Sequence, residues 1–512
     1  MYHKKDDLSQ LISALSKAEK KCLTIFFTIF PKRQKRNYMQ LLEFIQKKSP
    51  HYKSSLEGSL KTKINAKRRL YDNIMRSLRH HHDTKSIDII IQNLLSEIEI
   101  LYDLCLPEQA FTALQRAYLH ASKYEKHGLL LQIIEWERKL NLVLDKPSRS
   151  NETIEQEEQH VLEKLNQVIA FRNIFSKVKE IKNKLGYIKN LCQEKIKLDA
   201  ELLPLQNVAC LSQKAYFYYH LIHALYYWML FQHKDAYTHS KQLLAPKIQL
   251  VLPNECLDGI FEHITSCVCS GYFEEALSCM DLADQFIHRQ RFDQSNSFLL
   301  QTFFTKILYK LLIYSYMGAV EKLSTTVQEA EEKLYRYDTQ FSTVMKQLIY
   351  ANLMIAYVTI DQVEKTEEII EDTLRKGHKL IRKDIYDGAV FFRLFILLYT
   401  ETYILLPSAA LSAQRYYKQF KKNKNELYDT EYKIAKLLQK EHDYGNEQTK
   451  RIVLKEIKQI LKKSLAATTG LNNFQEYYTQ FIIWTDSMLN KRKFHEEAAE
   501  WYRQYRLSIK VS

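Results

Sequence analysis

The stretch Ser270-Gly271-Tyr272-Phe273-Glu274-Glu275-Ala276-Leu277 marks a short turn between two predicted helices. A small residue and Glu-Ala open the second helix of the pair. The stretch therefore predicts a pair of antiparallel helices joined by a tight connection.

Related turns recur along the second half of the chain. Their anchor residues are Ala236, Ala276, Lys322, Lys365, Ala410 and Ala498. Successive spacings are 40, 46, 43, 45 and 88 residues, and the last leaves room for a degenerate unit around residues 445–465. A period near 44 predicts helix pairs that bury their apolar stripes by stacking on neighbouring pairs. The predicted fold is therefore all-α, a right-handed α-solenoid of stacked antiparallel helix pairs.

The composition agrees with long helices and short turns. The 512 residues include only 10 Gly and 8 Pro, whereas average usage predicts roughly 36 and 26. Because β-hairpins and phosphate-binding loops need glycine, β-rich folds and Gly-rich nucleotide sites are both disfavoured. Eight scattered cysteines do not form a secreted disulfide pattern, and the N-terminus lacks the order of a signal peptide. We therefore expect a cytoplasmic protein.

Composition shifts and turn residues divide the chain into four expected regions. They are a basic helical bundle at 1–85 with helices at 8–30, 38–47 and 56–80, the first helical-repeat pairs at 86–144, a polar linker and long helical arm at 145–204, and the solenoid at 205–512. A helix-turn-helix-like arrangement is one option for the first region.

Two segments of the chain resemble the tetratricopeptide-like helical-repeat superfamily. They are GYFEEALSCMDLA at 271–283 and LPEQAFTALQRA at 106–117, which share the small-residue and Glu-Ala turn of that superfamily. The resemblance implies an α-solenoid that binds peptides or proteins along its concave face. The whole chain also resembles a bacterial family of all-helical proteins of similar length, through Leu15–Lys20 and Ile133–Arg138. That second resemblance implies no activity.

Positive charge is concentrated near the N-terminus. Residues 1–85 contain 20 Lys and Arg against 7 Asp and Glu, which leaves 55 against 53 for the rest of the chain. The third predicted helix carries seven basic residues, Lys61, Lys63, Lys67, Arg68, Arg69, Arg76 and Arg79. These side chains could neutralise the phosphates of DNA or RNA, or dock on an acidic protein or membrane surface. A solvated helix face without a specific role is the third interpretation.

The sequence predicts neither an enzyme nor a cofactor site. It lacks the Gly-rich nucleotide motifs and the Gly-x-Ser-x-Gly motif, and His495-Glu496-Glu497-Ala498-Ala499 lacks the second histidine of a zinc-protease helix. The uncharged segment Ala215–Phe231 is shorter than a membrane span and contains two histidines, so it is interpreted as a central solenoid helix.

No metal site is expected either. Cys267 and Cys269, with His263 nearby, suggest zinc ligands, but residues two apart on a helix point in different directions. Buried cysteines acting as small apolar residues are the simpler interpretation. The run His80-His81-His82 could also hold a metal ion, but it is interpreted more simply as a solvated helix end, where the helix dipole favours protonated histidine.

The tyrosine-rich helix leaves two alternatives open. The tyrosines concerned are Tyr216, Tyr218, Tyr219, Tyr226 and Tyr227. They form either an aromatic groove for peptide side chains or, more simply, packing contacts whose hydroxyls reach the rim.

Two functional hypotheses follow. The favoured one is a non-enzymatic scaffold or regulator that captures a protein or peptide partner on its helical repeats. The alternative is a nucleic-acid-binding regulator, with residues 1–85 on DNA or RNA and the solenoid as sensor or dimerisation module. Membrane insertion is not expected.

Overall fold

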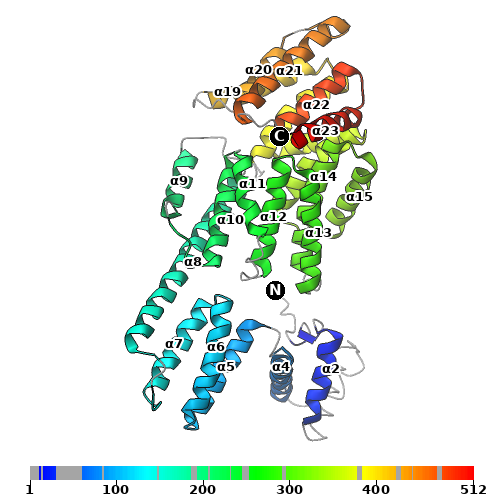
Figure 1. Cartoon of the computed structure of the whole chain (residues 1–512). Coiled ribbons are helices and arrows are strands. Elements are labelled where there is room, and N and C mark those ends of the chain that lie inside the picture. Colours follow the sequence, from blue (N-terminus) through cyan, green and yellow to red (C-terminus); the bar gives the residue numbers. More distant parts are fainter. Residues whose placement is uncertain are drawn as a thin grey trace. The chain divides into compact units, whose positions relative to one another are not determined.

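The computed structural model of the chain is built from helices. The described residues are 8, 11–12, 15–29, 60–82, 86–146, 149–185, 193–205, 208–230, 232–244, 253–290, 296–377, 383–421, 428–440, 442–469 and 476–511. Within these ranges there are 21 α-helices and no β-strand, which confirms the all-α prediction for this part of the chain (Figure 1). None of these helices combines the length and the apolar character that crossing a membrane requires.

The chain divides into two compact units, Met1–Leu165 and Asn166–Ser512. The long helix α8 (Asn151–Leu185) runs through the residue at which they divide. The finer boundaries expected near residues 85, 144 and 204 stay predictions.

In the first unit, α2 (Lys17–Phe26) packs on α4 (Leu60–His82). Leu23 of α2 and Leu70 and Ile74 of α4 are buried in their shared core. The face of α4 that carries Leu70 and Ile74 is thus the face that packs, whereas Arg68, Arg69, Arg76 and Arg79 are exposed to solvent.

The start of α2 is fixed by local hydrogen bonds. Ser16 accepts a hydrogen bond from the backbone N–H of Glu19, whose carboxylate accepts one from the backbone of Ser16 at 2.7 Å. This reciprocal capping satisfies two backbone donors that a helix start otherwise leaves open. The helix expected at 38–47 lies outside the described residues.

Three consecutive antiparallel helices complete the core of the first unit: α5 (Ile87–Asp103), α6 (Pro107–Lys123) and α7 (His127–Asn141). All three helices lie within residues 86–144, where the sequence predicts the first helical pairs. Alanines of α6 are buried between leucines and isoleucines of α5 and α7, so the backbones approach closely.

A buried carboxylate ties the start of α8 to α7. Glu137 is 3% exposed, and the guanidinium of Arg149 donates to it from Nε at 2.9 Å and from a second nitrogen at 2.5 Å. The same guanidinium also contacts Glu157. Because an unpaired buried charge is costly, Arg149 fixes the segment that the sequence suggested as a linker.

The second unit consists mainly of consecutive helix pairs, preceded by α9 (Gln193–Leu202). The pairs are α10 (Gln213–Met229) with α11 (His233–Lys241), α12 (Pro253–Cys269) with α13 (Phe273–Gln290), α14 (Asn296–Met317) with α15 (Val320–Arg336), α16 (Thr343–Thr359) with α17 (Val363–Lys376), α18 (Lys383–Tyr399) with α19 (Leu406–Lys421), α20 (Asp429–Leu438) with α21 (Glu447–Thr469), and α22 (Glu476–Asn490) with α23 (Phe494–Val511). Every predicted anchor residue lies in the second helix of a pair. The right-handed solenoid itself stays a prediction.

The turns within these pairs share one backbone feature. Gly271, Gly318 and Asp361 follow α12, α14 and α16 respectively, and their φ angles are 79°, 62° and 66°. A left-handed residue at this point reverses the chain within a few residues. Asp361 shows that the conformation does not require glycine by itself.

The last helix, α23, packs on helices distant in sequence as well as on its neighbour α22. Helix α23 contacts α14 and α16, and the hydroxyl of Tyr505 donates to the carbonyl of Ser270 at 3.1 Å. A Cβ at Gly318 would lie 2.2 Å from the carbonyl oxygen of His495. A simple array, in which each pair touches mainly its neighbours, does not predict this return. The turns are covered by backbone and by tyrosine from the far end of the chain.

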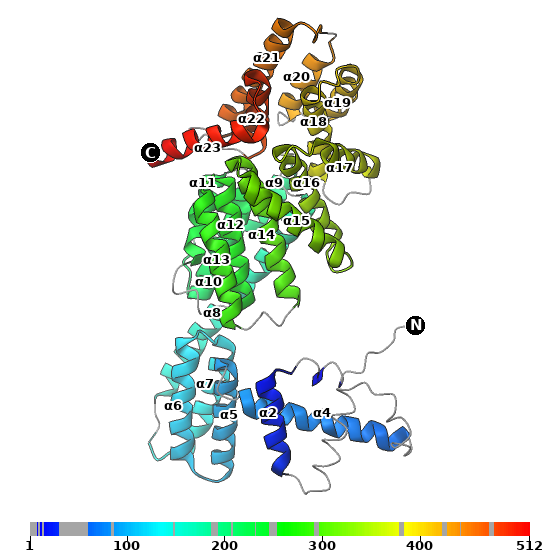
Figure 2. The same cartoon turned by 90° about the vertical axis from the view of Figure 1, so that its right-hand side faces the viewer.

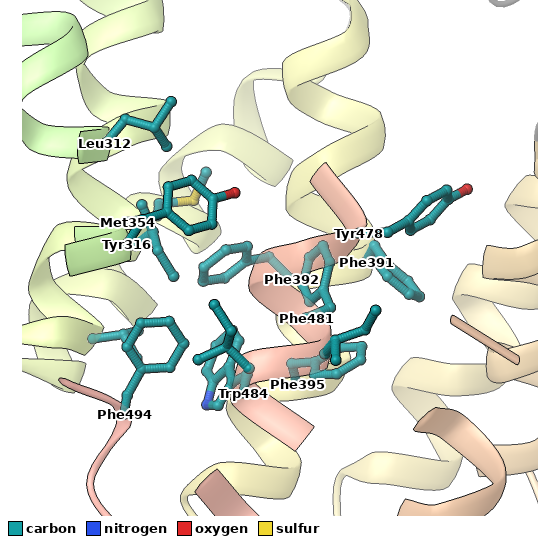
Figure 3. Close-up of a cluster of buried hydrophobic side chains, with 14 of the residues drawn as sticks. Leu312, Tyr316, Met354, Phe391, Phe392, Phe395, Tyr478, Phe481, Trp484 and Phe494 are labelled. Atoms are coloured by element: carbon teal, nitrogen blue, oxygen red, sulfur yellow. The ribbon is translucent and has the colours of Figure 1, made fainter. Parts of the chain in front are cut away.

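Aromatic rings pack α18 against α22, the helix that precedes α23. Figure 3 shows Phe391 and Phe395 of α18 around Phe481 and Trp484 of α22. The ring centroids of Phe395 and Phe481 are 4.6 Å apart, and those of Phe391 and Phe481 are 4.7 Å apart. Phe494 at the start of α23 continues the cluster, with its ring 6.1 Å from that of Trp484.

The Gly318→Ala substitution tests the packing of α23 on the turns. We expect the free energy of unfolding to fall by about 1–3 kcal/mol, because the new methyl group meets α23 and the φ angle disfavours alanine. Chemical denaturation of the full chain measures the change.

Two matched glycines separate the causes of that loss. Gly377 has a φ of 34° but only one side-chain atom within contact range, and Gly128 has nothing within 4 Å. Gly377→Ala should cost less than Gly318→Ala, and Gly128→Ala should cost nothing. Equal losses at Gly318 and Gly377 would contradict the proposed clash with α23.

Candidate functional site: an apolar groove, a basic helix, a histidine cluster and a His-Cys-Glu cluster

A groove of about 720 Å³ opens in the second unit. Its walls come from α8, α10, α12, α14 and the start of α16; Figure 1 shows α10, α12 and α14 side by side, and Figure 2 views the same row of helices end-on. Its principal apolar side chains are Phe175, Trp228, Phe261, Phe304, Tyr309 and Met345. The first helices of the pairs therefore form the groove, because they are apolar on more than one side and leave part of that surface uncovered.

Charged groups in the groove are neutralised by one another. The ammonium group of Lys182 lies 2.8 Å from a carboxylate oxygen of Glu262 and 4.5 Å from the ring of Trp228. That of Lys179 lies 3.2 Å from the carboxylate of Asp258. Such paired groups add orientation to an apolar surface without giving it a strong net charge.

Sequence reasoning did not identify this groove. Its signal was present in the segments Ala215–Phe231 and Phe298–Val320, which are apolar around most of the helix and which fill parts of α10 and α14. Their pattern shows burial, but it cannot show which apolar residues meet a neighbour and which face an opening.

The tyrosines proposed as an aromatic groove do not line this one. Tyr226 donates to Asp199 at 2.8 Å, and Tyr216 donates to Gln242 at 3.1 Å. Tyr218 donates to Glu255 and is 2% exposed. These three rings pack between helices while their hydroxyls find polar partners.

The basic helix presents one charged face. Its described basic side chains are exposed and belong to Arg68, Arg69, Arg76 and Arg79. At 3.6 residues per turn these four positions fall within about 100° of one another. Leu70 and Ile74 are buried on the opposite side. The side chains of Lys61, Lys63 and Lys67 lie outside the described residues.

The histidines of α10 and α11 form a neutral cluster. His220 Nδ1 lies 3.0 Å from His239 Nδ1, and the rings of His223 and His239 stack with centroids 5.0 Å apart. Burial, reinforced by the neighbouring His223, lowers the pKa of His220 to about 4. Burial likewise lowers the pKa of His239 to about 4 and lowers that of His223.

The cysteines considered for zinc lie on different sides of α12. Trp228 Nε1 donates to Cys269 Sγ at 3.3 Å, whereas Cys267 Sγ lies 3.4 Å from His263 Nε2. The prediction that Cys267 and Cys269 diverge is therefore correct in geometry. The sequence analysis did not consider Glu275 of α13, whose carboxylate lies close to His263 and Cys267. Within the described ranges, His263, Cys267 and Glu275 are the one group of three that brings potential metal-ligand atoms together, within 4.8 Å of one another.

No family model matches the chain, and the comparisons with curated proteins and with solved structures gave no match either. Functional conclusions therefore rest on the groove, the basic face and the clusters themselves.

The histidine cluster predicts a specific acid sensitivity. The unfolded chain takes up protons near the ordinary histidine value of 6.5, while folded His220 and His239 resist protonation down to about 4. The free energy of unfolding should therefore be highest above pH 6.5 and fall progressively toward pH 4. Chemical denaturation across this range measures the slope.

In the His239→Asn variant, the slope should become shallower because one neutral buried histidine is gone. His160→Asn is the control, since His160 is exposed on α8. A slope that is unchanged in His239→Asn would contradict the assignment.

Proposed function

We propose that the chain is a non-enzymatic binding protein whose second unit captures a peptide or a protein segment in the groove. The observation that carries this proposal is the apolar groove, in which the charges of Lys179 and Lys182 are already paired. Nothing in such a surface demands a charged ligand. Its length along several helices suits an extended segment better than a small compact molecule.

The walls of the groove offer side chains that a ligand can reach. Phe304 and Met345 are half-buried, so part of each remains accessible from the opening. Beside them, Tyr309 donates to Thr265 at 2.7 Å, which holds the ring in place. Fixed aromatic and flexible thioether groups together favour apolar ligand side chains.

A tetratricopeptide-like solenoid, in which first helices line a binding surface, is the architecture we infer for this unit. The consecutive pairs and their shared left-handed turns support that inference. A reducing, cytoplasmic location is part of the same proposal. It is supported by the seven described cysteines, none of which forms a disulfide.

The groove is tested with a random peptide library panned against the full chain, followed by fluorescence anisotropy on the selected peptides. The selected peptides should be rich in apolar residues. Phe304→Glu and Met345→Glu should each weaken their binding at least about tenfold, because each places a charge on the apolar wall.

Tyr335→Glu is the matched control, since Tyr335 is 90% exposed on α15 and does not line the groove. Its affinity should equal that of the unmodified chain. Peptides that bind all three variants equally would show that the groove is not their site.

The basic face of α4 favours a second function, binding of DNA or RNA. Four exposed arginines on one side of a helix, with an apolar core on the other, form a surface that can follow a phosphate backbone. The distribution of charge along the sequence adds that the rest of the chain is nearly neutral.

Replacing Arg68, Arg69, Arg76 and Arg79 together by Gln tests this second function. Electrophoretic mobility shifts of the full chain with duplex DNA and with RNA should weaken by more than about tenfold, with a shallower dependence on salt.

The control variant removes the same charge from four separate, exposed positions, namely Arg116, Lys123, Lys234 and Lys455. It should leave the mobility shift nearly intact. Equal losses in the two variants would indicate a response to net charge alone, and nucleic-acid recognition by α4 would be wrong.

A further inference from the structure

His263, Cys267 and Glu275 are arranged as metal ligands at the hairpin of α12 and α13. His263 and Cys267 are four residues apart and therefore share one face of α12. Glu275 stands at the third position of α13, across the turn that contains Gly271. His263 and Cys267 are fully buried, whereas the side chain of Glu275 is 36% exposed.

Two of the three distances between the ligand atoms match those around a tetrahedral zinc ion. His263 Nε2 lies 3.4 Å from Cys267 Sγ and 3.3 Å from Glu275 Oε1. Zinc bonds of about 2.0–2.3 Å at tetrahedral angles separate nitrogen from sulfur by about 3.5 Å and nitrogen from oxygen by about 3.4 Å. All three ligand atoms lie within 4.8 Å of one another, so the partly exposed Glu275 carboxylate moves toward Cys267 Sγ when all three bind one ion.

The hydrogen bonds around His263 turn its Nε2 lone pair toward the other two ligands. The single hydroxyl hydrogen of Ser240 is donated to the carbonyl of Tyr237 at 3.0 Å. Ser240 Oγ, 3.0 Å from His263 Nδ1, can then accept a hydrogen from that nitrogen. In this tautomer of the neutral ring, Nε2 carries no hydrogen, and its lone pair faces Cys267 Sγ and Glu275 Oε1, as a metal ligand requires.

Hydrogen bonds from α11 also orient the carboxylate of Glu275. Tyr237 donates to its second carboxylate oxygen at 2.8 Å, and Lys241 donates to the hydroxyl of Tyr237 at 3.2 Å. Partners of this kind orient the ligands of protein metal sites. They are independent of the three ligands and come from a different helix, α11.

We propose that His263, Cys267 and Glu275 bind one Zn²⁺ ion, which links α12 to α13 beside the turn covered by α23. A thiolate, a carboxylate and a neutral imidazole balance the charge of the ion, so the buried site carries no net charge. Imidazole nitrogen, thiolate sulfur and carboxylate oxygen are each donors that zinc accepts in proteins. The site is separate from the groove, and the proposal does not depend on the function of the groove.

Zn²⁺ and the spectroscopic substitute Co²⁺ test the proposal on the full chain after treatment with a chelator. We expect one ion per chain, a higher thermal unfolding midpoint with Zn²⁺, and a thiolate-to-cobalt charge-transfer band with Co²⁺. Cys267→Ser should abolish that band. Glu275→Gln, at a half-exposed position that tolerates change, should weaken Zn²⁺ binding at least about tenfold.

Cys269→Ser is the matched control, because Cys269 is buried on the same helix but contacts Trp228. It should keep both the charge-transfer band and the affinity for Zn²⁺. Circular dichroism of the metal-free variants establishes that each is folded. The proposal is overturned if the folded chain binds no stoichiometric Zn²⁺ or Co²⁺, or if the band persists in Cys267→Ser.

Discussion

The packing of α22 against α18 is the contact on which much of the second unit depends. Phe391, Phe395, Phe481 and Trp484 are all essentially buried there, and their rings fill the space between the two helices. Large rings contribute much apolar area and few rotamers, so this contact is both strong and specific. It fixes the direction in which the chain leaves α22, and therefore where α23 lies. Without it, the last helix would have no defined path back to the turns after α12 and α14.

That return changes the role of the repeated turns. In a turn between helices, glycine is usually favoured because the φ angle is positive. Gly271 and Gly318 are also required by packing, because Tyr505 and the backbone of His495 occupy the space that a side chain would fill. Lys493, the residue before α23, forms an ion pair with Asp361 at 2.7 Å. The turn after α16 therefore also contacts this end of the chain. The pairs are thus held by a helix distant in sequence as well as by their neighbours.

The groove and the zinc ligands arise from one property of the helix pairs. The first helices of several pairs, α10, α14, α16 and α18, are apolar on several sides, so part of such a helix can face an opening while the rest is packed. The second helices are amphipathic, and their first turns bring acidic residues such as Glu275 toward the buried side chains of the preceding helix. Opening and cluster therefore lie in the same set of pairs, but on different sides of α12, where Cys267 and Cys269 diverge.

The sequence alone determined the helices, their pairing and the charged face of α4, because these depend on residues near one another in the chain. Scarce glycine, recurrent Glu-Ala turns and helical spacing carry that information. Only the tertiary structure decided which apolar surfaces stay open, that α23 returns to the turns, and that Glu275 meets His263 and Cys267. It also showed that Arg149 is the partner of buried Glu137. Such contacts join residues through packing directions, and the spacing of apolar residues along one helix does not specify them.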